Sequence, residues 1–425
     1  SATVDGANQA VINFQILRDG VPLDLLNLPT DLTTASNRPS FVLAYAQDQD
    51  AITDPAEYNN LGRSAAQPQT ASISAVDSMV DNGDGTFTAT IDGAFPAGAT
   101  LRAVGLQGYF QVTLSGENTP LHTPSAVVAV SGDAERREVV DNNNCASCHE
   151  WLEAHGGNRV FNMNICVMCH VPNLSSSGRS ITAPSSTLVD DLTAADIDGV
   201  DPNDPLTYPE ATNNFKDMIH GIHGGATRTT DYQFVRGGRQ GYYNWSDVVF
   251  PASASDCLRC HKAETFEVPL NANTLLTTDR TTGVADGQDA TEADVSAARD
   301  TVPNETDFVI TPTAAACYAC HDSQLAQAHM ADNGGAINDN RSTVVDAGSV
   351  ETCQICHGAG KPQDLEVVHA AEQLTLIGTI TAPESGDDGG SGDQSQVALC
   401  GPGPIAAQPG GHTTRLDCYN CHSFN

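Results

Sequence analysis

The sequence contains few aromatic residues, few basic residues and no long hydrophobic run. No run of about 18 apolar residues occurs, so we expect no transmembrane helix. Aromatic side chains make up only 5% of the 425 residues, which is little for the core of a protein of this length. With 19 basic residues against 53 acidic ones, the net charge is −34, which argues against nucleic acid as a partner. An acidic surface suited to saline or divalent-rich water is the simplest interpretation, and docking of cationic partners is the alternative.

Cysteine is scarce as well, but its placement follows a strict pattern. Twelve of the 13 cysteines form six C-x-x-C pairs, and a histidine directly follows each pair. In this motif both cysteines lie on one face of a helical turn, where they form thioethers with the two vinyl groups of a c-type haem. The histidine then ligates the haem iron. The sequence therefore predicts six covalently bound haem c groups, at Cys145, Cys148 and His149; Cys166, Cys169 and His170; Cys257, Cys260 and His261; Cys317, Cys320 and His321; Cys353, Cys356 and His357; and Cys418, Cys421 and His422.

Neither of the usual structural uses of cysteine explains this pattern. A disulfide framework would not place a histidine after every cysteine pair. Zinc knuckles would need each C-x-x-C pair to be matched with a second pair of ligands. Haem attachment also accounts for the scarcity of aromatic side chains, because six porphyrins supply large apolar surfaces to a core.

The histidines outside the motifs nearly match the number of second axial ligands that six irons need. Seven such histidines occur, and two histidines per iron would give six-coordinate haems of low potential. The five methionines leave His/Met ligation open, but it is not favoured. For the sixth haem we expect His412, or else His122 donated from the N-terminal region of the same or an adjacent chain. The histidines expected to serve the other five haems are His155, His220, His223, His329 and His369.

Three regions follow from the pattern along the chain. Residues 1–138 carry strand-length apolar runs separated by Asp-Gly and Asn-Gly turns, which is typical of an all-β sandwich or split barrel. Residues 139–373 contain five haem motifs with short helical turns and little regular pattern between them, so we expect a haem-cored domain. Residues 374–425 comprise a strand-like run, a flexible acidic Gly/Ser-rich linker at 384–393 and the sixth motif. The apolar runs expected as strands of the first region are 11–17, 41–46, 86–91, 101–114 and 126–130.

The residues around the motifs carry a family resemblance. The segments 136–159, 166–173 and 215–223 resemble the first pentahaem module of the OmcA/MtrC-type outer-membrane multihaem cytochromes, and 317–330 and 353–369 fit as well. The resemblance covers roughly residues 1–370 and implies a β-rich domain before the haems and electron transfer to extracellular minerals. Members of that family typically carry ten or more haems in two modules, whereas this chain has one module and a single sixth haem. The resemblance therefore does not imply the full architecture or docking to a porin.

Two functions remain in competition at the level of sequence. The first is extracellular electron transfer through six closely packed haems to metal oxides, flavins, electrodes or the next subunit of a filament, without a dedicated enzymatic activity. The second is a multihaem reductase of a small oxyanion, which would need one five-coordinate haem. The histidine count favours the first. Because c-type haem is attached outside the cytoplasm, we expect export through the periplasm to the outer cell surface or the medium, and the start at Ser1 suggests a processed chain.

The C-terminal haem motif predicts self-association. A haem tethered by a flexible linker at the end of the chain is suited to bridging to another subunit, and such a contact repeats without closing into a linear homopolymer. A monomer whose last haem is simply the exit site is the alternative. Cys400 has no motif and is expected to be a free or buried thiol.

Acidic clusters give a further hypothesis. Asp196, Asp198 and Asp201 offer hard oxygen ligands at the close spacing that calcium takes, and Asp81 with Asp84 offers a smaller set. Neither cluster matches a complete EF-hand loop, so solvated acidic loops are the alternative.

Overall fold

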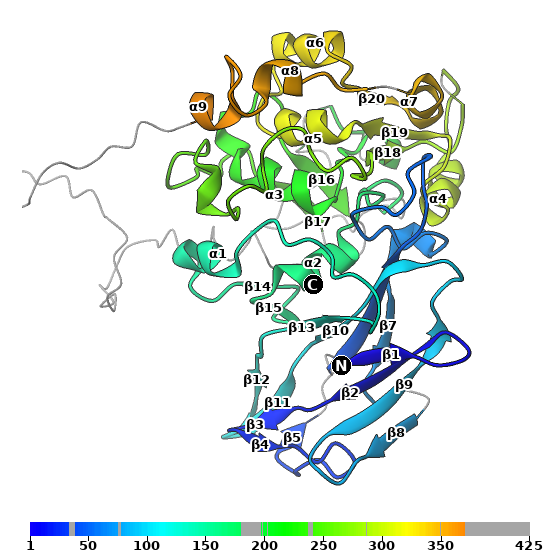
Figure 1. Ribbon diagram of the computed structural model, residues 1–425, viewed down its shortest axis with the longest axis vertical. Coiled ribbons are helices and arrows are strands. Elements are labelled where there is room, and N and C mark those ends of the chain that lie inside the picture. The colour runs from blue at the N-terminus through cyan, green and yellow to red at the C-terminus, as the bar shows by residue number, and fades with distance from the viewer. Residues whose placement is uncertain are drawn as a thin grey trace, which may run out of the picture.

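The chain combines a β-rich N-terminal part with a second part of short helices and small sheets (Figure 1). The computed structural model describes residues 1–33, 39–74, 78–179, 197, 199–201, 203–236, 241–285, 287–348 and 350–369. Within these ranges, no helix combines the length and the apolar character needed to cross a bilayer. The strand-like run at 374–380, the linker, Cys400 and the sixth motif with His412 lie outside the described residues.

Two antiparallel four-stranded sheets form a sandwich in the N-terminal part. Apolar side chains alternate along the strands, so that Ile12 and Ile91 of one sheet and Phe41 and Val104 of the other are buried in one shared core. The first sheet has the order β1 (Ala2–Val4), β2 (Gln9–Phe14), β9 (Phe87–Ala94) and β8 (Ser78–Asp81). The second has the order β13 (Ala126–Ala129), β10 (Thr100–Gln107), β6 (Ser40–Ala46) and β7 (Gln69–Ser72).

The sandwich interpretation of the N-terminal sequence is confirmed, and two expected strands are divided. The run at 11–17 leaves β2 after Phe14, and only its last residue, Leu17, belongs to β3. The run at 101–114 forms β10 and then β11 (Phe110–Leu114), which turns away after Gln107 to pair in a separate sheet. Gly108, with a φ of 96°, provides the turn between them. The separate sheet has the order β12 (Glu117–Leu121), β11 and β5 (Leu32–Thr33), and β3 (Leu17–Arg18) pairs with β4 (Val21–Pro22).

The second part is built from short elements, as expected for a domain whose core is not made by a sheet. Its small sheets pair β14 (Glu153–Ala154) with β15 (Arg159–Val160), β16 (Gln233–Arg236) with β17 (Gly241–Asn244), and β18 (Thr277–Thr281) with β19 (Asp307–Ile310) and β20 (Ile337–Asn340).

The α-helices are α1 (Asn142–His149), α2 (Met163–Cys169), α3 (Phe215–His223), α4 (Glu292–Asp300), α5 (Pro312–Tyr318), α6 (Gln324–Asp332), α7 (Arg341–Ala347), α8 (Gln354–His357) and α9 (Leu365–His369). The 3-10 helices are η1 (Ser64–Ala66), η4 (Pro205–Thr207), η5 (Gly225–Thr227) and η6 (Cys257–Arg259). The division of the chain at residues 138 and 373 stays a prediction.

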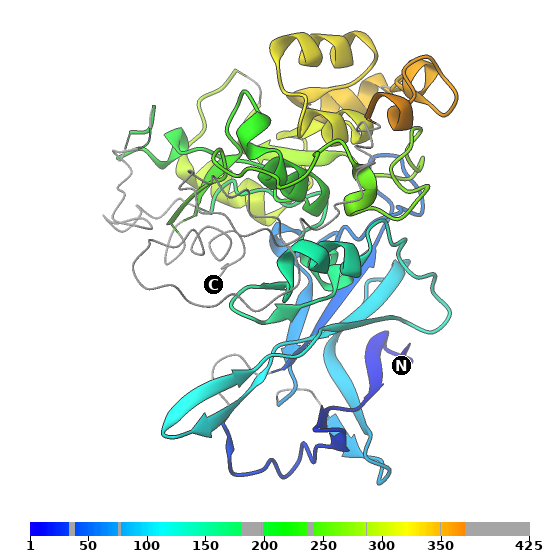
Figure 2. The ribbon, with the colours of Figure 1, turned by 90° about the vertical axis from the view of Figure 1, so that its left-hand side faces the viewer.

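Helix α2 packs on the outer face of the sandwich sheet that contains β6 and β10. Ile165 and Met168 of α2 are buried against Val42 and Ala103. Gly105 of β10 allows this approach, because a Cβ there would lie 2.4 Å from Cδ1 of Ile165. Helix α2, which carries the motif at 166–170, therefore lies beside the β-sandwich, while α8 and α9 lie at the far end of the second part (Figures 1 and 2).

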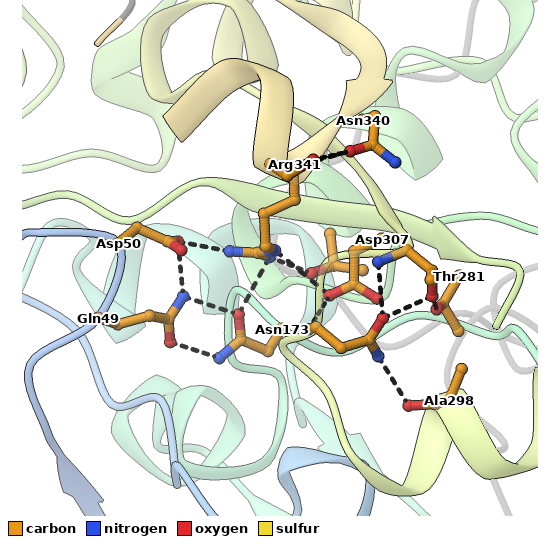
Figure 3. A network of polar contacts seen from close by, with 12 residues as sticks. Gln49, Asp50, Asn173, Thr281, Ala298, Asp307, Asn340 and Arg341 are labelled. Atoms are coloured by element: carbon orange, nitrogen blue, oxygen red, sulfur yellow. Dashed lines mark hydrogen bonds and ion pairs between the residues drawn. The ribbon is translucent and has the colours of Figure 1, made fainter. Parts of the chain in front are cut away.

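A buried polar network also joins the two parts (Figure 3). Arg341, the first residue of α7, forms ion pairs with Asp50, which follows β6, and with Asp307 of β19. Its guanidinium also donates to Thr278 Oγ1 at 2.7 Å. Asn173, in the segment after α2, exchanges two amide hydrogen bonds with Gln49, of 3.0 and 2.8 Å. Because Arg341 and Asp307 are almost fully buried, this network fixes the sandwich against the β18–β20 sheet.

Candidate haem centres

The five described C-x-x-C-H motifs all adopt the helical turn that haem attachment needs. The motif at 145–149 lies in α1. In each of the other four, the backbone N–H of the histidine donates to the carbonyl of the first cysteine, at 2.8 to 2.9 Å, which places the cysteines and the histidine on one turn. All ten cysteines of these motifs are free of disulfides. The motifs therefore present paired thiols and an imidazole on a single helical turn.

Each of the five motif histidines lies opposite a histidine from outside the motifs. No pair joins two motif histidines or two of the others. The distances between ring centres fall in a narrow range. They are 6.1 Å for His149 and His223, 6.0 Å for His170 and His155, 6.0 Å for His261 and His220, 5.9 Å for His321 and His369, and 6.1 Å for His357 and His329.

This spacing fits one iron between the two rings of each pair. A metal–imidazole bond is about 2.0 Å long, so two such bonds in line, with the distance from nitrogen to ring centre on either side, span about 6.2 Å. Edge-to-face contact between aromatic rings allows centre distances of about 4.5 to 7 Å and would not require five nearly equal values. The residues present thus fit a haem iron with two axial histidines at every described motif.

The backbone orients several of these imidazoles. Nδ1 of His170 donates to the carbonyl of Asn213 at 2.9 Å, and Nδ1 of His357 donates to that of Gln363 at 3.0 Å. His223 and His369 each donate from Nδ1 to the carbonyl four residues earlier in their own helix, at 2.9 and 3.1 Å. A hydrogen bond at Nδ1 fixes the ring and leaves Nε2 as the ligating atom. Sequence reasoning missed these carbonyl groups, because a backbone acceptor has no residue type to identify it.

Burial favours the neutral form of several of these imidazoles. It lowers the pKa of His170 to about 4 and that of His220 to about 3. It also lowers the pKa values of His149, His223 and His261. A neutral imidazole has the lone pair that a metal ion needs, so these side chains are ready to bind iron at neutral pH.

Helix α3 supplies two of the second histidines. His220 and His223 lie on one side of its last turns, as their spacing predicts, and face His261 and His149 respectively. The opposite side is buried, with Met218 and Ile222 packed around Tyr232 and Trp245. A single well-packed helix therefore fixes the axial ligands of two neighbouring centres.

Neighbouring motifs lie close together in an order that differs from the sequence. Burial raises the pKa values of Cys166, Cys257, Cys260 and Cys317, and thiols of a neighbouring motif add to each shift. Cys166 interacts with Cys145 in this way, Cys260 with Cys145 and Cys148, Cys257 with Cys320, and Cys317 with Cys353. The motifs thus form one row, which begins beside the β-sandwich with the motif at 166–170 and continues through those at 145–149, 257–261, 317–321 and 353–357.

Among the histidines outside the motifs, His122 is the one in the described chain that faces no motif histidine. Its Nδ1 lies 2.6 Å from a carboxylate oxygen of Glu153, and its ring packs on Tyr109 and against Gly157. Its expected alternative role, as a ligand of the sixth haem, stays a prediction.

The calcium hypotheses find no support in the described residues, where no three histidine, cysteine or acidic side chains converge on a common point. Asp196 and Asp198 lie outside the described residues, so the site there stays a prediction. Asp201 accepts from the backbone N–H of Asn203. Asp81 and Asp84 accept from backbone N–H groups in the turn before β9.

Comparison with known proteins places these centres in a family. Solved structures that resemble the chain include the outer membrane decaheme cytochrome OmcA, with a TM-score of 0.42 and 18% identity over 87% of this chain and 48% of that one. MtrC from Shewanella baltica OS185 has a TM-score of 0.42 and 14% identity over 84% of this chain and 50% of that one. The chain thus spans about half the length of these structures, and no curated protein matches it. The family model of MtrC/MtrF-like outer membrane cytochromes, domains II/IV, matches residues 137–370, which is more than half of the chain and contains all five described centres, so the chain belongs to the MtrC/MtrF-like outer membrane cytochrome family.

Proposed function

We propose that this protein carries electrons outside the cell through six covalently bound c-type haems, each with two axial histidines. The five histidine pairs of the described chain support the assignment of five of them, because each pair has the spacing that one iron needs. The haems would supply one-electron redox chemistry, while the chain positions the irons, keeps their ligands neutral and excludes water from them. The acceptors we propose are metal oxides, flavins, electrodes or a further subunit.

The row of motifs supports conduction rather than storage of electrons. Thiols of adjacent motifs lie close enough to influence each other's pKa values, so neighbouring porphyrins would lie near one another throughout the row. Electrons could then pass between the sandwich end and the α8–α9 end without leaving the protein. The strongly acidic surface would keep such a protein soluble and reduce non-specific association.

The haem count and ligation can be tested together. Mass spectrometry of the purified protein should give the mass of the chain with six haems, and peptide mapping should place one haem on each motif. Spectra of the oxidised protein should show only low-spin haem. Fewer haems, or a motif with unmodified cysteines, would contradict the assignment at that motif.

The competing function, reduction of a small oxyanion, needs one haem with an open axial position. Each of the five described motif histidines has a second histidine opposite it, which favours the conduit over the reductase. A high-spin ferric signal in the purified protein, with turnover of nitrite or another small oxyanion, would favour the reductase instead.

We further propose that the C-terminal haem joins one subunit to the next in a linear polymer. For its second ligand we favour His412 over His122, because the His122 ring is already held by Glu153, Tyr109 and Gly157. Truncation after Asp393 removes the sixth motif together with Cys400 and His412, and it leaves the other five motifs in place. Filaments formed by the intact protein and not by the truncated one would support the bridge. A protein that stays monodisperse at high concentration would rule out the polymer.

A further inference from the structure

Three arginines gather around one of the five centres. Arg179 lines a cavity together with Gln67, whose side-chain amide donates to the carbonyl of Cys169 at 3.2 Å. Arg159 of β15 and Arg236 of β16 lie within electrostatic range of His170. The neighbours of other motif histidines are different. His261 interacts with Glu267 and with a single arginine, Arg137, and His321 interacts with Asp322. The centre at Cys166 and Cys169 thus has an unusually positive environment.

The Arg179 guanidinium lacks the partners that a buried charge needs. Its Nε and Nη2 atoms are buried and have no hydrogen-bond acceptor among the described residues. Its charged neighbours include the cations Arg236 and Arg299. The nearby Asp300 carboxylate already forms an ion pair with Arg299 at 2.8 Å and accepts a hydrogen bond from the Ser64 hydroxyl at 3.1 Å. Burial of an uncompensated guanidinium is costly, so an anion is needed at this position.

Arg236 is the second largely desolvated arginine near this centre. It lies at the end of β16, where desolvation lowers its pKa and the Tyr243 hydroxyl partly opposes the shift. The chain has only 19 basic residues and a net charge of −34, so it has carboxylates in excess. The described part of the chain nevertheless brings none of them to Arg236 in an ion pair. Within the described residues, neither arginine has a carboxylate partner in an ion pair, whereas a haem carries two propionates.

We propose that Arg179 and Arg236 bind the propionate carboxylates of the haem attached to Cys166 and Cys169, and that the arginine cluster makes this haem the most readily reduced of the five. The inference rests on the proposed function, because it requires a haem at this motif. Positive charge near an iron favours the state that has gained an electron. The three positive guanidinium groups outnumber the two negative propionates, so the net charge around this haem is positive. A haem without arginine partners keeps the two negative charges of its propionates.

The position of this haem gives the inference a functional meaning. It stands at the sandwich end of the row, where α2 packs on β6 and β10. Electrons that enter the row elsewhere would collect at this end. The protein would thus have a preferred direction of electron flow toward the β-sandwich.

The test is a redox titration that follows each haem separately by the NMR signals of its methyl groups. In Arg179→Gln and in Arg236→Gln we expect the reduction equilibrium constant of the haem at Cys166 and Cys169 to fall about tenfold, which equals about 59 mV for one electron. The other four haems should keep their potentials. Arg179→Lys retains the charge and should keep most of the effect. Arg18→Gln serves as the matched control, since Arg18 pairs with Asp31 on the surface of the β-rich part.

Two outcomes would overturn the inference and one would overturn the proposed function. If this haem keeps its potential in both glutamine variants, the arginines do not act on it. Arg179 also lines a cavity of about 340 Å³ together with Arg63 and Arg299, so a free oxyanion could be the occupant. A potential that responds to added phosphate in the wild type and not in Arg179→Gln would identify that source and exclude the propionate. Absence of haem from Cys166 and Cys169 in the wild-type protein, found by peptide mapping, would contradict the proposed function itself.

Discussion

At the scale of single residues, histidine is used in two distinct ways in the described chain. Ten histidines form the five pairs, and burial keeps several of them neutral. His122 instead binds a carboxylate and packs on a tyrosine. The two uses differ in the group that faces the ring, which is another histidine in the pairs and a carboxylate at His122. The position in the sequence does not separate them.

The pairing of His223 with His149 makes a specific prediction. In His223→Met, the haem at Cys145 and Cys148 should gain a thioether ligand, which raises the potential of a haem relative to bis-histidine ligation. A redox titration should show one component moved upward and the others in place. For the five described haems, His122→Met is the matched control, because this ring faces none of their centres. A titration curve of His223→Met that matches the wild type would remove His223 from the ligands.

A buried carboxyl group predicts a pH dependence of stability. Desolvation raises the pKa of Glu210 from 4.5 to about 7, although the Ser177 hydroxyl donates to it at 3.0 Å. Between these two pKa values the folded protein holds a proton that the unfolded chain releases, so stability should fall as the pH rises from 4.5 to 7. Denaturant unfolding at both pH values should show a smaller fall in Glu210→Gln. An equal fall in the variant would assign the pH dependence to other groups.

At the scale of elements, helix α3 is constrained on two sides. One side carries the two histidines that we propose as axial ligands, and the other packs into the cluster around Trp245. Gly221 allows the helix to lie close to Tyr232, whose hydroxyl donates to the carbonyl of Thr212 at 2.6 Å. The packing of α3 therefore affects two candidate haem centres at once.

A methyl group at Gly221 should disturb both centres together. A Cβ there would lie 2.7 Å from Cδ2 of Tyr232, so Gly221→Ala should displace α3 and cost about 1 to 3 kcal/mol of stability. The haems at Cys145/Cys148 and Cys257/Cys260 should shift in potential, and the other three should not. In the control Gly6→Ala, the added methyl group meets nothing within 4 Å. A shift confined to one haem would show that the two ligands move independently.

The sequence predicted the elements better than it predicted their partners. The spacing of C-x-x-C-H identifies the proximal ligands, because all three side chains belong to one helical turn. The alternating runs of β2, β6 and β9 likewise carry their own pattern of burial. Which second histidine faces which motif depends on how α3, α6 and α9 pack, and no local pattern encodes that. The backbone carbonyls that accept from histidine Nδ1 could not be predicted for the same reason.

At the scale of the whole molecule, the Arg341 network holds the sandwich against the second part (Figure 3). Arg341 is 4% exposed and Asp307 is fully buried. This role could not be predicted from the sequence, because a single arginine at the start of a short helix carries no pattern that marks it as buried. The network arises only when segments distant in the sequence meet.

Removal of the arginine should destabilise the whole protein. Arg341→Met leaves Asp307 buried without its countercharge, and loss of one partner of a buried pair costs about 3 to 5 kcal/mol. Denaturant unfolding followed by circular dichroism should show this loss. Arg18→Met breaks the exposed pair with Asp31 and should change stability little. Equal effects of the two substitutions would show that the network is not essential to the joint between the parts.

The histidine pairs have a consequence for how the chain is held together. A haem bonded to a motif and ligated by a distant histidine is a cross-link, and it closes a loop of the chain much as a disulfide does. The pairs from His149 to His223 and from His220 to His261 close loops that overlap around α3. Loss of an axial bond would then open a loop as well as alter a potential. In such a chain the groups that carry electrons would also stabilise the fold, so a substitution at an axial ligand would change the redox potential and the stability together.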